Sequence, residues 1–359
     1  MKPLQKNDIP VGFSGSVSWR SPSNLAIIKY WGKHGVQLPG NASVSFTLSE
    51  AVTETSVTYK IKPADSDFPD IKFSFEGKPQ PAFESRIKKF LYSIRDSYLP
   101  LLSALSLEID SKNSFPHSSG IASSASAMSA LALCLTDIEY QAKGITADEA
   151  FYRKASEISR LGSGSACRSI YPYMALWGVH PDIPGSSDQY AIPFETEIHD
   201  VFKGFHDDIL IISSAEKSVS SSAGHQLMNG NIYADTRYRQ AGERMSALKN
   251  ILQTGDVPAF GKISEDEALT LHALMMCSDP SYILMEENTL TAIRAIRQFR
   301  QDTGVQVYFS LDAGPNIHLL YPDSDKYKLS LFISEVLQPL CHNGRIIHDK
   351  AGKGPEKMN

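Results

Sequence analysis

A run of small residues directly before a predicted helix is the feature that most limits how this chain can fold. The segment FPHSSGIASSASAMSALAL, residues 115–133, contains six serines, five alanines and one glycine. Apolar residues recur at helical spacing from Met128 to Ile138, which predicts a helix over Ser126–Tyr140. The first N–H groups of a helix have no intrahelical partner and lie at its positive end, so small side chains there let an anion approach closely.

This run predicts a polyphosphate site in which backbone N–H groups and serine hydroxyls surround the phosphates. The residues assigned to it are Ser118, Ser119, Gly120, Ser123 and Ser124, with Ser124 as the candidate Mg²⁺ ligand. No GK[ST] sequence follows, which excludes a Walker A loop. The alternative is a helix start whose serines and alanines pack tightly against a neighbouring element.

Composition is typical of a globular protein with a substantial core. Of the 359 residues, 42% are hydrophobic and 21% charged, and the length suits two domains or one large bilobal unit. The net charge of −5 argues against a general nucleic-acid-binding surface. The sequence shows neither the apolar run of a transmembrane helix nor that of a signal peptide. Four widely spaced cysteines fit a cytoplasmic protein without a structural zinc site.

Strand-like and helix-like segments are mixed without strict alternation, which predicts an α+β fold. A proline-rich stretch over 180–197 marks the expected boundary between domains 1–193 and 194–359, and the tail GKGPEKMN is expected to fray. The predicted strands are 25–28, 52–62, 71–75, one beginning at 208 and a hairpin over 305–321; the predicted helices are 82–98, 126–140, 147–161, 231–253, 264–276 and 328–337.

Three further stretches carry polar residues suited to an anionic substrate. In SPSNLAIIKYWGKHG, Lys29, Tyr30 and Lys33 follow an apolar strand and offer two point charges and a hydroxyl donor. SRLGSGSACRS ends a helix in a hydroxyl-rich turn before Arg168, and arginine suits bidentate binding of carboxylate or phosphate. In VQVYFSLDAGPNIHLLY, Asp312 is the last residue on the polar face of a strand, where a carboxylate could act on a substrate hydroxyl.

Each of these stretches also has a purely structural interpretation. The lysines could belong to a solvated strand end, and the glycines of GSGS could form a helix C-cap followed by an exposed arginine. Asp312 could begin a turn by bonding its own backbone.

Together, NLAIIKYWGK, NSFPHSSGIASSAS, GSGSACRS and LDAGPN resemble the diphosphomevalonate decarboxylase family of the GHMP kinase superfamily. They occur in the family's order, and the resemblance covers about residues 18–355. EKSVSSSAGH and KAGKGP are similar to further family segments. KYWGK with GSGSACRS is specific to the decarboxylase branch, whereas the serine-rich loop is shared across the superfamily.

The resemblance implies a GHMP kinase fold, with an N-terminal α/β lobe of the ribosomal protein S5 domain 2-like type, a C-terminal ferredoxin-like lobe and a cleft between them. It implies ATP-dependent decarboxylation of mevalonate 5-diphosphate to isopentenyl diphosphate, with ADP, phosphate and CO₂ as the other products, in the mevalonate pathway of isoprenoid biosynthesis. ATP and Mg²⁺ are the implied cofactors and the small-molecule substrate is the implied partner. A cytoplasmic homodimer, without nucleic acid or a membrane, is the family expectation.

The same resemblance implies roles for individual residues. Asp312 matches the catalytic aspartate that orients or deprotonates the substrate hydroxyl, Arg168 the arginine that holds the substrate carboxylate, and Lys29 a lysine near the reacting groups. The positions matching the substrate-binding set are Tyr30, Lys33, Ser163, Ser165 and Arg168, and residues 118–124 match the ATP phosphate loop.

The sequence also departs from the family pattern. His117 and Ser118 stand in place of Thr-Ala, Ser126-Ala127 in place of Ala-Gly, and Ser218 in place of a second lysine. These changes bear on nucleotide contacts rather than on reaction type, and His117 is expected to be structural. The alternatives are a phosphomevalonate decarboxylase acting on the monophosphate, a GHMP small-molecule kinase that stops at phosphorylation, and a non-catalytic binding protein.

Overall fold

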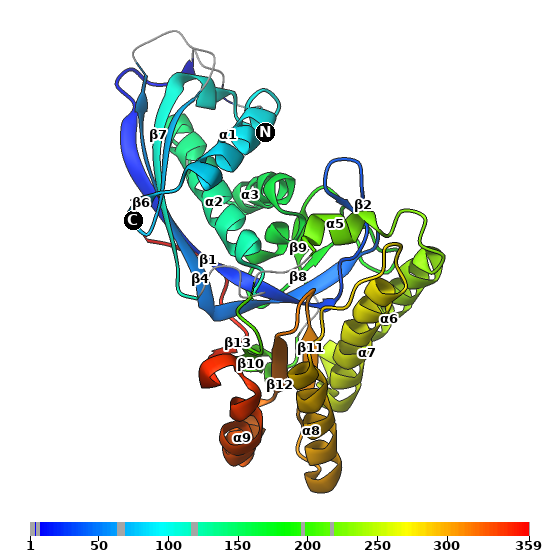
Figure 1. The fold of residues 1–359 in the computed structure, drawn as a ribbon. Helices are drawn as coiled ribbons and strands as arrows, with labels where there is room; N and C mark the ends of the chain where they lie inside the picture. Colours follow the sequence, from blue (N-terminus) through cyan, green and yellow to red (C-terminus); the bar gives the residue numbers. More distant parts are fainter. Residues whose placement is uncertain are drawn as a thin grey trace.

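Two β-sheets with their own helices lie one above the other in the computed structural model, which describes residues 4, 8–62, 69–115, 121–194, 198–215 and 219–358 (Figure 1). The first sheet has the strand order β14-β1-β4-β7-β5-β6, and β8 and β9 extend it from β4. Its strands are β1 (Ser14–Ile28), β4 (Ser43–Ile61), β5 (Asp70–Phe75), β6 (Lys78–Pro79), β7 (Leu105–Asn113), β8 (Met174–Trp177), β9 (Ala191–Pro193) and β14 (Glu356–Lys357). A small hairpin of β2 (Lys33–His34) and β3 (Leu38–Pro39) stands apart.

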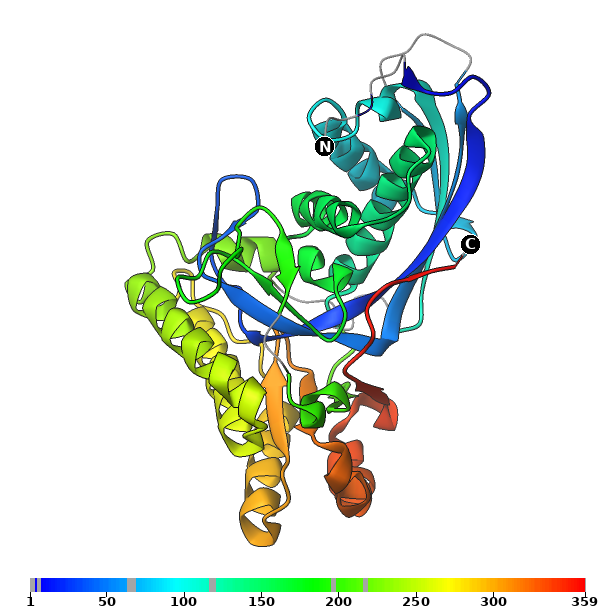
Figure 2. The same cartoon turned by 180° about the vertical axis from the view of Figure 1, so that it is seen from behind.

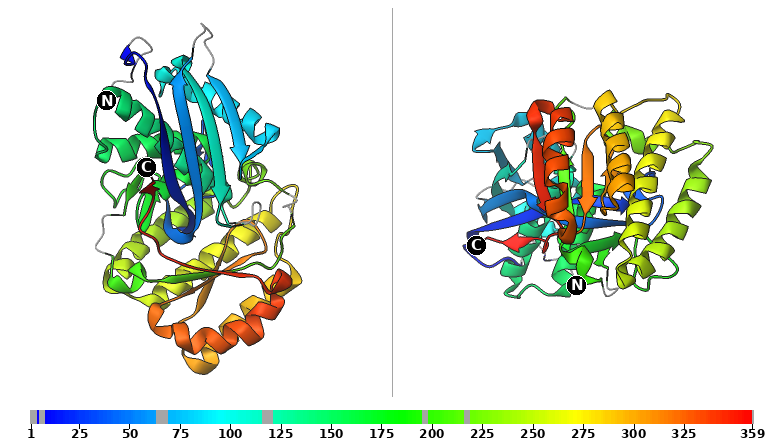
Figure 3. Two further views of the ribbon diagram at one scale, coloured as in Figure 1. Left: turned by 90° about the vertical axis from the view of Figure 1, so that its left-hand side faces the viewer. Right: turned by 90° about the horizontal axis from the view of Figure 1, so that it is seen from below.

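Three helices cover one face of the first sheet: α1 (Pro81–Arg95), α2 (Ser123–Lys143) and α3 (Glu149–Gly162). In the left view of Figure 3 they lie behind the strands. The small residues of α2 let it pack tightly, because Ser126 Oγ lies 2.7 Å from Thr53 Oγ1 and Ser129 Oγ lies 2.6 Å from Ser21 Oγ. The tight-packing interpretation of the serine-rich run is therefore correct for these two serines.

The second sheet has the antiparallel order β11-β12-β10-β13. Its strands are β10 (His206–Leu210), β11 (Tyr308–Leu311), β12 (Ile317–Tyr321) and β13 (Ile346–Lys350). The helices of this half of the chain are α4 (Asp200–Lys203), α5 (Ser221–Gln226), α6 (Ala234–Thr254), α7 (Val257–Met276), α8 (Glu287–Thr303) and α9 (Lys326–Phe332), of which α5 lies beside β2 and β9 of the upper part (Figure 1). Phe309 packs in a core with residues of α8 and α9, whereas Tyr308 on the opposite face contacts the core of α6 and α7. Figure 3, right, shows these helices from below.

The C-terminal segment returns to the first sheet, as the red strand in Figure 2 shows. β14 pairs with β1, with Trp19 opposite Lys357, and the N–H of Met358 donates to Ser18 O at 2.8 Å. The expectation that this tail frays is therefore wrong, because its backbone N–H and C=O groups find partners along a sheet edge. The division at residue 193 remains a prediction.

Most predicted elements are present, with shifted ends. The strand predicted at 25–28 is the end of the 15-residue β1, whose register shifts between Pro22 and Asn24 and so interrupts the alternation. The helix predicted from residue 264 begins at Val257 with a proline in its first turn, where the missing N–H costs nothing.

Candidate active site

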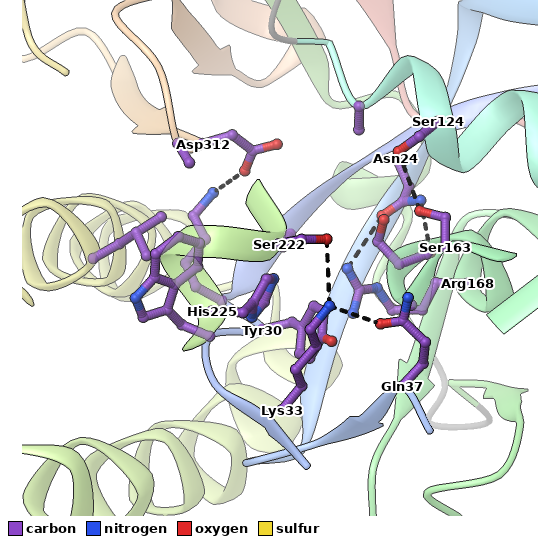
Figure 4. A pocket seen from close by; sticks show the side chains of 18 of the residues that line it. Asn24, Tyr30, Lys33, Gln37, Ser124, Ser163, Arg168, Ser222, His225 and Asp312 are labelled. Carbon is purple, nitrogen blue, oxygen red and sulfur yellow. Dashed lines mark hydrogen bonds and ion pairs between the residues drawn. The ribbon is translucent and has the colours of Figure 1, made fainter. Parts of the chain in front are cut away.

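A cavity of about 290 Å³ lies where the two sheets meet (Figure 4). Its lining includes eight residues singled out from the sequence: Lys29, Tyr30, Lys33, Ser124, Ser163, Ser165, Arg168 and Asp312. Ser123 lies beside a neighbouring cavity instead. Ser118, Ser119 and Gly120, together with His117 and Ser218, fall outside the described residues.

One ion pair in the cavity joins residues from opposite ends of the sequence. Lys29 directly follows β1 and Asp312 directly follows β11, and Lys29 Nζ lies 2.9 Å from Asp312 Oδ1. The Lys29 side chain is 2% exposed and that of Asp312 is 25% exposed. Lys29 is thus not at a solvated strand end, and the Asp312 side chain does more than begin its own turn. A charged pair so placed can both attract an anion and accept a proton.

The peptide groups of Lys29 are held by a second buried charge cluster. Glu267 on α7 accepts the Lys29 N–H at 2.7 Å, and Arg237 on α6 donates to Lys29 O at 3.0 Å. Glu267 also accepts two bonds of 2.6 Å from Arg237 and one of 2.6 Å from Arg244. Asn41 donates to the same Lys29 carbonyl at 3.0 Å. These bonds fix the strand end that carries the ammonium group.

Arg168 is a buried cation held by hydroxyl groups. It lies in a 3₁₀ helix, Gly164–Ile170, and donates to Ser45 Oγ at 2.6 Å and Ser43 Oγ at 2.5 Å. The residue is 2% exposed, so the exposed-arginine interpretation is wrong. Within the described part of the chain, no carboxylate lies within ion-pair distance of its guanidinium. Burial lowers the pKa of Arg168. A buried cation of this kind is stabilised when an anion enters the cavity.

Tyr30 stands on the cavity wall between two rings. Its ring lies 4.7 Å from that of Trp177 and 4.1 Å from that of His225. Its hydroxyl is buried and has no hydrogen-bond partner among the described residues, and burial raises its pKa. Gly164 makes room for this ring, since a Cβ there would lie 3.0 Å from the Tyr30 hydroxyl. The hydroxyl is therefore a donor that a ligand can satisfy.

Lys33 lies at the opposite end of the cavity from Asp312. Its Nζ donates to Gln37 Oε1 at 3.2 Å and to Ser222 Oγ at 3.4 Å, and burial lowers its pKa. The buried Arg160 holds this loop by donating to Val36 O at 2.6 Å. The sequence analysis did not assign Gln37, Ser222, Asn24 or His225 to the site. Asn24 lies within SPSNLAIIKYWGKHG, and Ser222 and His225 lie within EKSVSSSAGH, so their place in these motifs could have indicated them.

The start of α2 faces the cavity without a capping side chain. Ala122 at its N-cap has φ of 37° and makes no side-chain cap bond. The N–H of Ala125 donates to Ala122 O at 2.7 Å, and those of Ser123 and Ser124 have no acceptor among the described residues, so they are available to an anion. Ser124 Oγ lies 3.1 Å from Ser163 Oγ. Ser124 also borders a second cavity of about 170 Å³, whose apolar lining includes Phe73, Phe75 and Phe83. A charged and an apolar compartment thus meet at this helix start.

Comparison with known proteins identifies the family. A model of the diphosphomevalonate decarboxylase-like N-terminal domain matches residues 21–191, and one of the mevalonate 5-diphosphate decarboxylase C-terminal domain matches residues 208–358. The diphosphomevalonate decarboxylase mvd1 of Aspergillus fumigatus is 31% identical over 337 residues, 89% of this chain and 80% of that protein. The chain belongs to the diphosphomevalonate decarboxylase family.

Solved structures of family members share the fold. A structure of MDDEF in complex with MVAPP, AMPPCP and magnesium is 28% identical, covers 97% of this chain and 100% of that one, and has a TM-score of 0.80. The mevalonate diphosphate decarboxylase from Staphylococcus aureus is 26% identical over 97% of this chain and 99% of its own, also with a TM-score of 0.80. The expected α+β GHMP kinase fold is confirmed. No helix in the described ranges is long and apolar enough to cross a bilayer.

Proposed function

We propose that the chain catalyses the ATP-dependent decarboxylation of mevalonate 5-diphosphate to isopentenyl diphosphate, ADP, phosphate and CO₂. The observation that carries this proposal is the charge arrangement of the cavity. Among the described lining residues, Asp312 is the one carboxylate, and it shares the cavity with the cationic side chains of Lys29, Lys33 and Arg168 and with several hydroxyls. A substrate with a diphosphate at one end, and a tertiary alcohol and a carboxylate at the other, matches this arrangement.

Asp312 and Lys29 would act on the tertiary hydroxyl. The Asp312 carboxylate would accept the hydroxyl proton, and ATP would supply the phosphoryl group that turns a poor leaving group into a phosphate ester. The Lys29 ammonium, 2.9 Å from Asp312, would offset the negative charge that gathers as the phosphoryl group is transferred and leaves. The hydrogen bonds of the Lys29 backbone with Glu267 and Arg237 would hold the ammonium group in a fixed position during the reaction.

Arg168 would bind the substrate carboxylate. Its guanidinium is buried beside Asn24, Ser43 and Ser45, so it is held in place before the substrate arrives. When the phosphate leaves, the carbon becomes electron-poor and the bond to the carboxylate breaks toward it, releasing CO₂. Holding the carboxylate in one orientation favours this step over attack by water.

The diphosphate would lie toward the other end, against Lys33 and Tyr30. Lys33 supplies the charge and the unpartnered Tyr30 hydroxyl supplies a donor. Ser163 and Ser165 line the same wall and add hydroxyl donors. These four residues suit a diphosphate better than a monophosphate, because two phosphate groups offer enough oxygen atoms to accept hydrogen bonds from all of them.

The nucleotide would bind at the start of α2. Its phosphates would meet the uncapped first turn, and the apolar cavity beside Ser124 would take the base against Phe73, Phe75 and Phe83. Mg²⁺ keeps most of its ligands as water and phosphate oxygen, and the Ser124 hydroxyl suits a single protein ligand. The residue roles, a cytoplasmic location and a homodimer belong to this proposal.

The test is CO₂ release from purified protein with ATP and Mg²⁺, using mevalonate 5-diphosphate and mevalonate 5-phosphate in parallel. We expect CO₂ and ADP in equal amounts, with the diphosphate strongly preferred. ADP formation without CO₂ would indicate a kinase, and preference for the monophosphate would indicate a phosphomevalonate decarboxylase. Neither product from either substrate would refute the proposal.

A further inference from the structure

His225 is a buried histidine on the cavity wall, and its second ring nitrogen has no partner among the described residues. The residue lies on α5, is 7% exposed, and sits between the rings of Tyr30 and Trp31 at 4.1 and 4.6 Å. The N–H of Gly32 donates to its Nδ1 at 3.0 Å. A neutral imidazole with an accepting Nδ1 carries its hydrogen on Nε2, so the backbone of Gly32 sets the tautomer.

Other buried histidines show what such a group normally does. His180 also accepts a backbone N–H at Nδ1, and its Nε2 pairs with Gly242 O at 3.1 Å. The Nε2 of His272 pairs with Asp312 O at 3.1 Å. The Nε2 of His225 has no such acceptor among the residues that the structure describes, and His225 lines the cavity. The ring is largely buried but lines the cavity, so a ligand bound there can supply the acceptor for this N–H.

We propose that His225 donates a hydrogen bond from Nε2–H to the diphosphate of the substrate, as a neutral member of the diphosphate site. This inference rests on the proposed function. Figure 4 places His225 beside Tyr30 and Ser222, at the Lys33 end of the cavity. Burial, with the nearby Lys33 and Arg168 charges, lowers the pKa of His225 to about 3, in keeping with a neutral ring. His225 thus adds a donor without adding a third positive charge beside Lys33 and Arg168.

Two substitutions separate the two ring nitrogens. In His225→Asn the amide oxygen can replace Nδ1 and keep the Gly32 bond, but no donor reaches the Nε2 position. In His225→Gln the amide nitrogen can reach that position. Removing a hydrogen bond to a charged group typically weakens binding by at least tenfold. We expect His225→Asn to raise the dissociation constant for mevalonate 5-diphosphate, measured by calorimetry without ATP, by at least tenfold, and His225→Gln to raise it clearly less.

The matched control is His180→Asn, which changes a buried histidine of the same tautomer outside the cavity and should leave that constant within about twofold. Wild-type affinity in His225→Asn, or equal losses in Asn and Gln variants, would overturn the inference. Wild-type protein that neither binds mevalonate 5-diphosphate nor releases CO₂ from it would overturn the proposed function as well. A readout that needs no variant is nitrogen NMR of His225 in the wild-type protein. Mevalonate 5-diphosphate should shift its Nε2–H signal, and an unmoved signal would count against the bond.

Discussion

Replacing Arg168 by methionine should nearly abolish activity while leaving the stability of the ligand-free protein almost unchanged. The guanidinium is buried, and among the described residues it bonds only to hydroxyl and amide oxygens, of which Ser45 Oγ and Ser43 Oγ are the near ones at 2.6 and 2.5 Å. Losing those two bonds costs about 1.5–3 kcal/mol each. Removing a buried cation relieves a desolvation penalty of several kcal/mol. The two effects oppose each other and are of similar size.

The expected net change in unfolding free energy is within about 1–2 kcal/mol, which corresponds to a few degrees in Tm for a chain of this size. The change in activity is larger because the substrate carboxylate would lose its buried partner. Breaking one side of a buried ion pair costs about 3–5 kcal/mol, or roughly 10²- to 10³-fold in kcat/KM.

Arg160 provides the matched control, since it is an equally buried arginine eight residues before Arg168 in the same sequence stretch. Its guanidinium bonds to the backbone carbonyls of Gln189 and Val36, both at 2.6 Å. Arg160→Met therefore leaves carbonyl groups unpaired and should lower Tm much more than Arg168→Met does. The measurements are Tm by calorimetry without ligand and kcat/KM by CO₂ release. A Tm loss in Arg168→Met as large as that in Arg160→Met would refute the reasoning, because Arg168 would then be structural.

Four other outcomes are expected. Asp312→Asn should lower kcat by roughly 10²–10⁴-fold while substrate affinity by calorimetry and Tm stay near wild type; a wild-type kcat would remove it from catalysis. Lys33→Ala should raise KM for mevalonate 5-diphosphate by at least tenfold with a smaller change in kcat, and an unchanged KM would exclude it from the site. Glu267→Gln should lower the unfolding free energy by about 3–5 kcal/mol and also lower kcat, which a purely structural role would spare. Burial disfavours the charged form of His318, but the Asp207 carboxylate 2.8 Å away raises its pKa overall. The stabilisation by this ion pair is therefore complete below about pH 6.5 and is lost as pH rises through the raised pKa. Urea unfolding between pH 6 and 9 should show a decrease in unfolding free energy, and His318→Gln should make that decrease smaller.

Local sequence patterns predicted what depends on local geometry. Helix periodicity located α2 and α3, and the structure places Lys29 and Asp312, the polar residues that follow apolar runs, in one cavity. What failed depended on contacts distant in sequence. The polar tail around Lys357 carries no strand pattern, yet it pairs with the edge of β1. No local pattern predicts a partner for Ser129, whose hydroxyl lies 2.6 Å from that of Ser21, more than 100 positions earlier.

The residues around His225 show a second limit of sequence. His225 follows a run of small residues, and no periodicity or charge pattern in the sequence predicts that it donates a hydrogen bond to a ligand. Its proposed role follows from which nitrogen accepts the Gly32 N–H, and that requires α5 to lie against the end of β1. Resemblance to a family recovered the motif around it but assigned no role to this side chain.

The position of Lys29 explains why the Lys29–Asp312 end of the cavity exists only in the assembled molecule. Its N–H is bound by Glu267, its carbonyl by Arg237 and its ammonium by Asp312, and all three partners lie more than 200 positions later in the chain. None of these contacts can form within the first sheet and its helices alone. The buried charges of Glu267 and Arg237 would be costly without each other, so the second sheet's helices must form this pair and dock together. Docking then brings the ammonium beside the carboxylate, and the same contacts that join the two sheets create the Lys29–Asp312 ion pair.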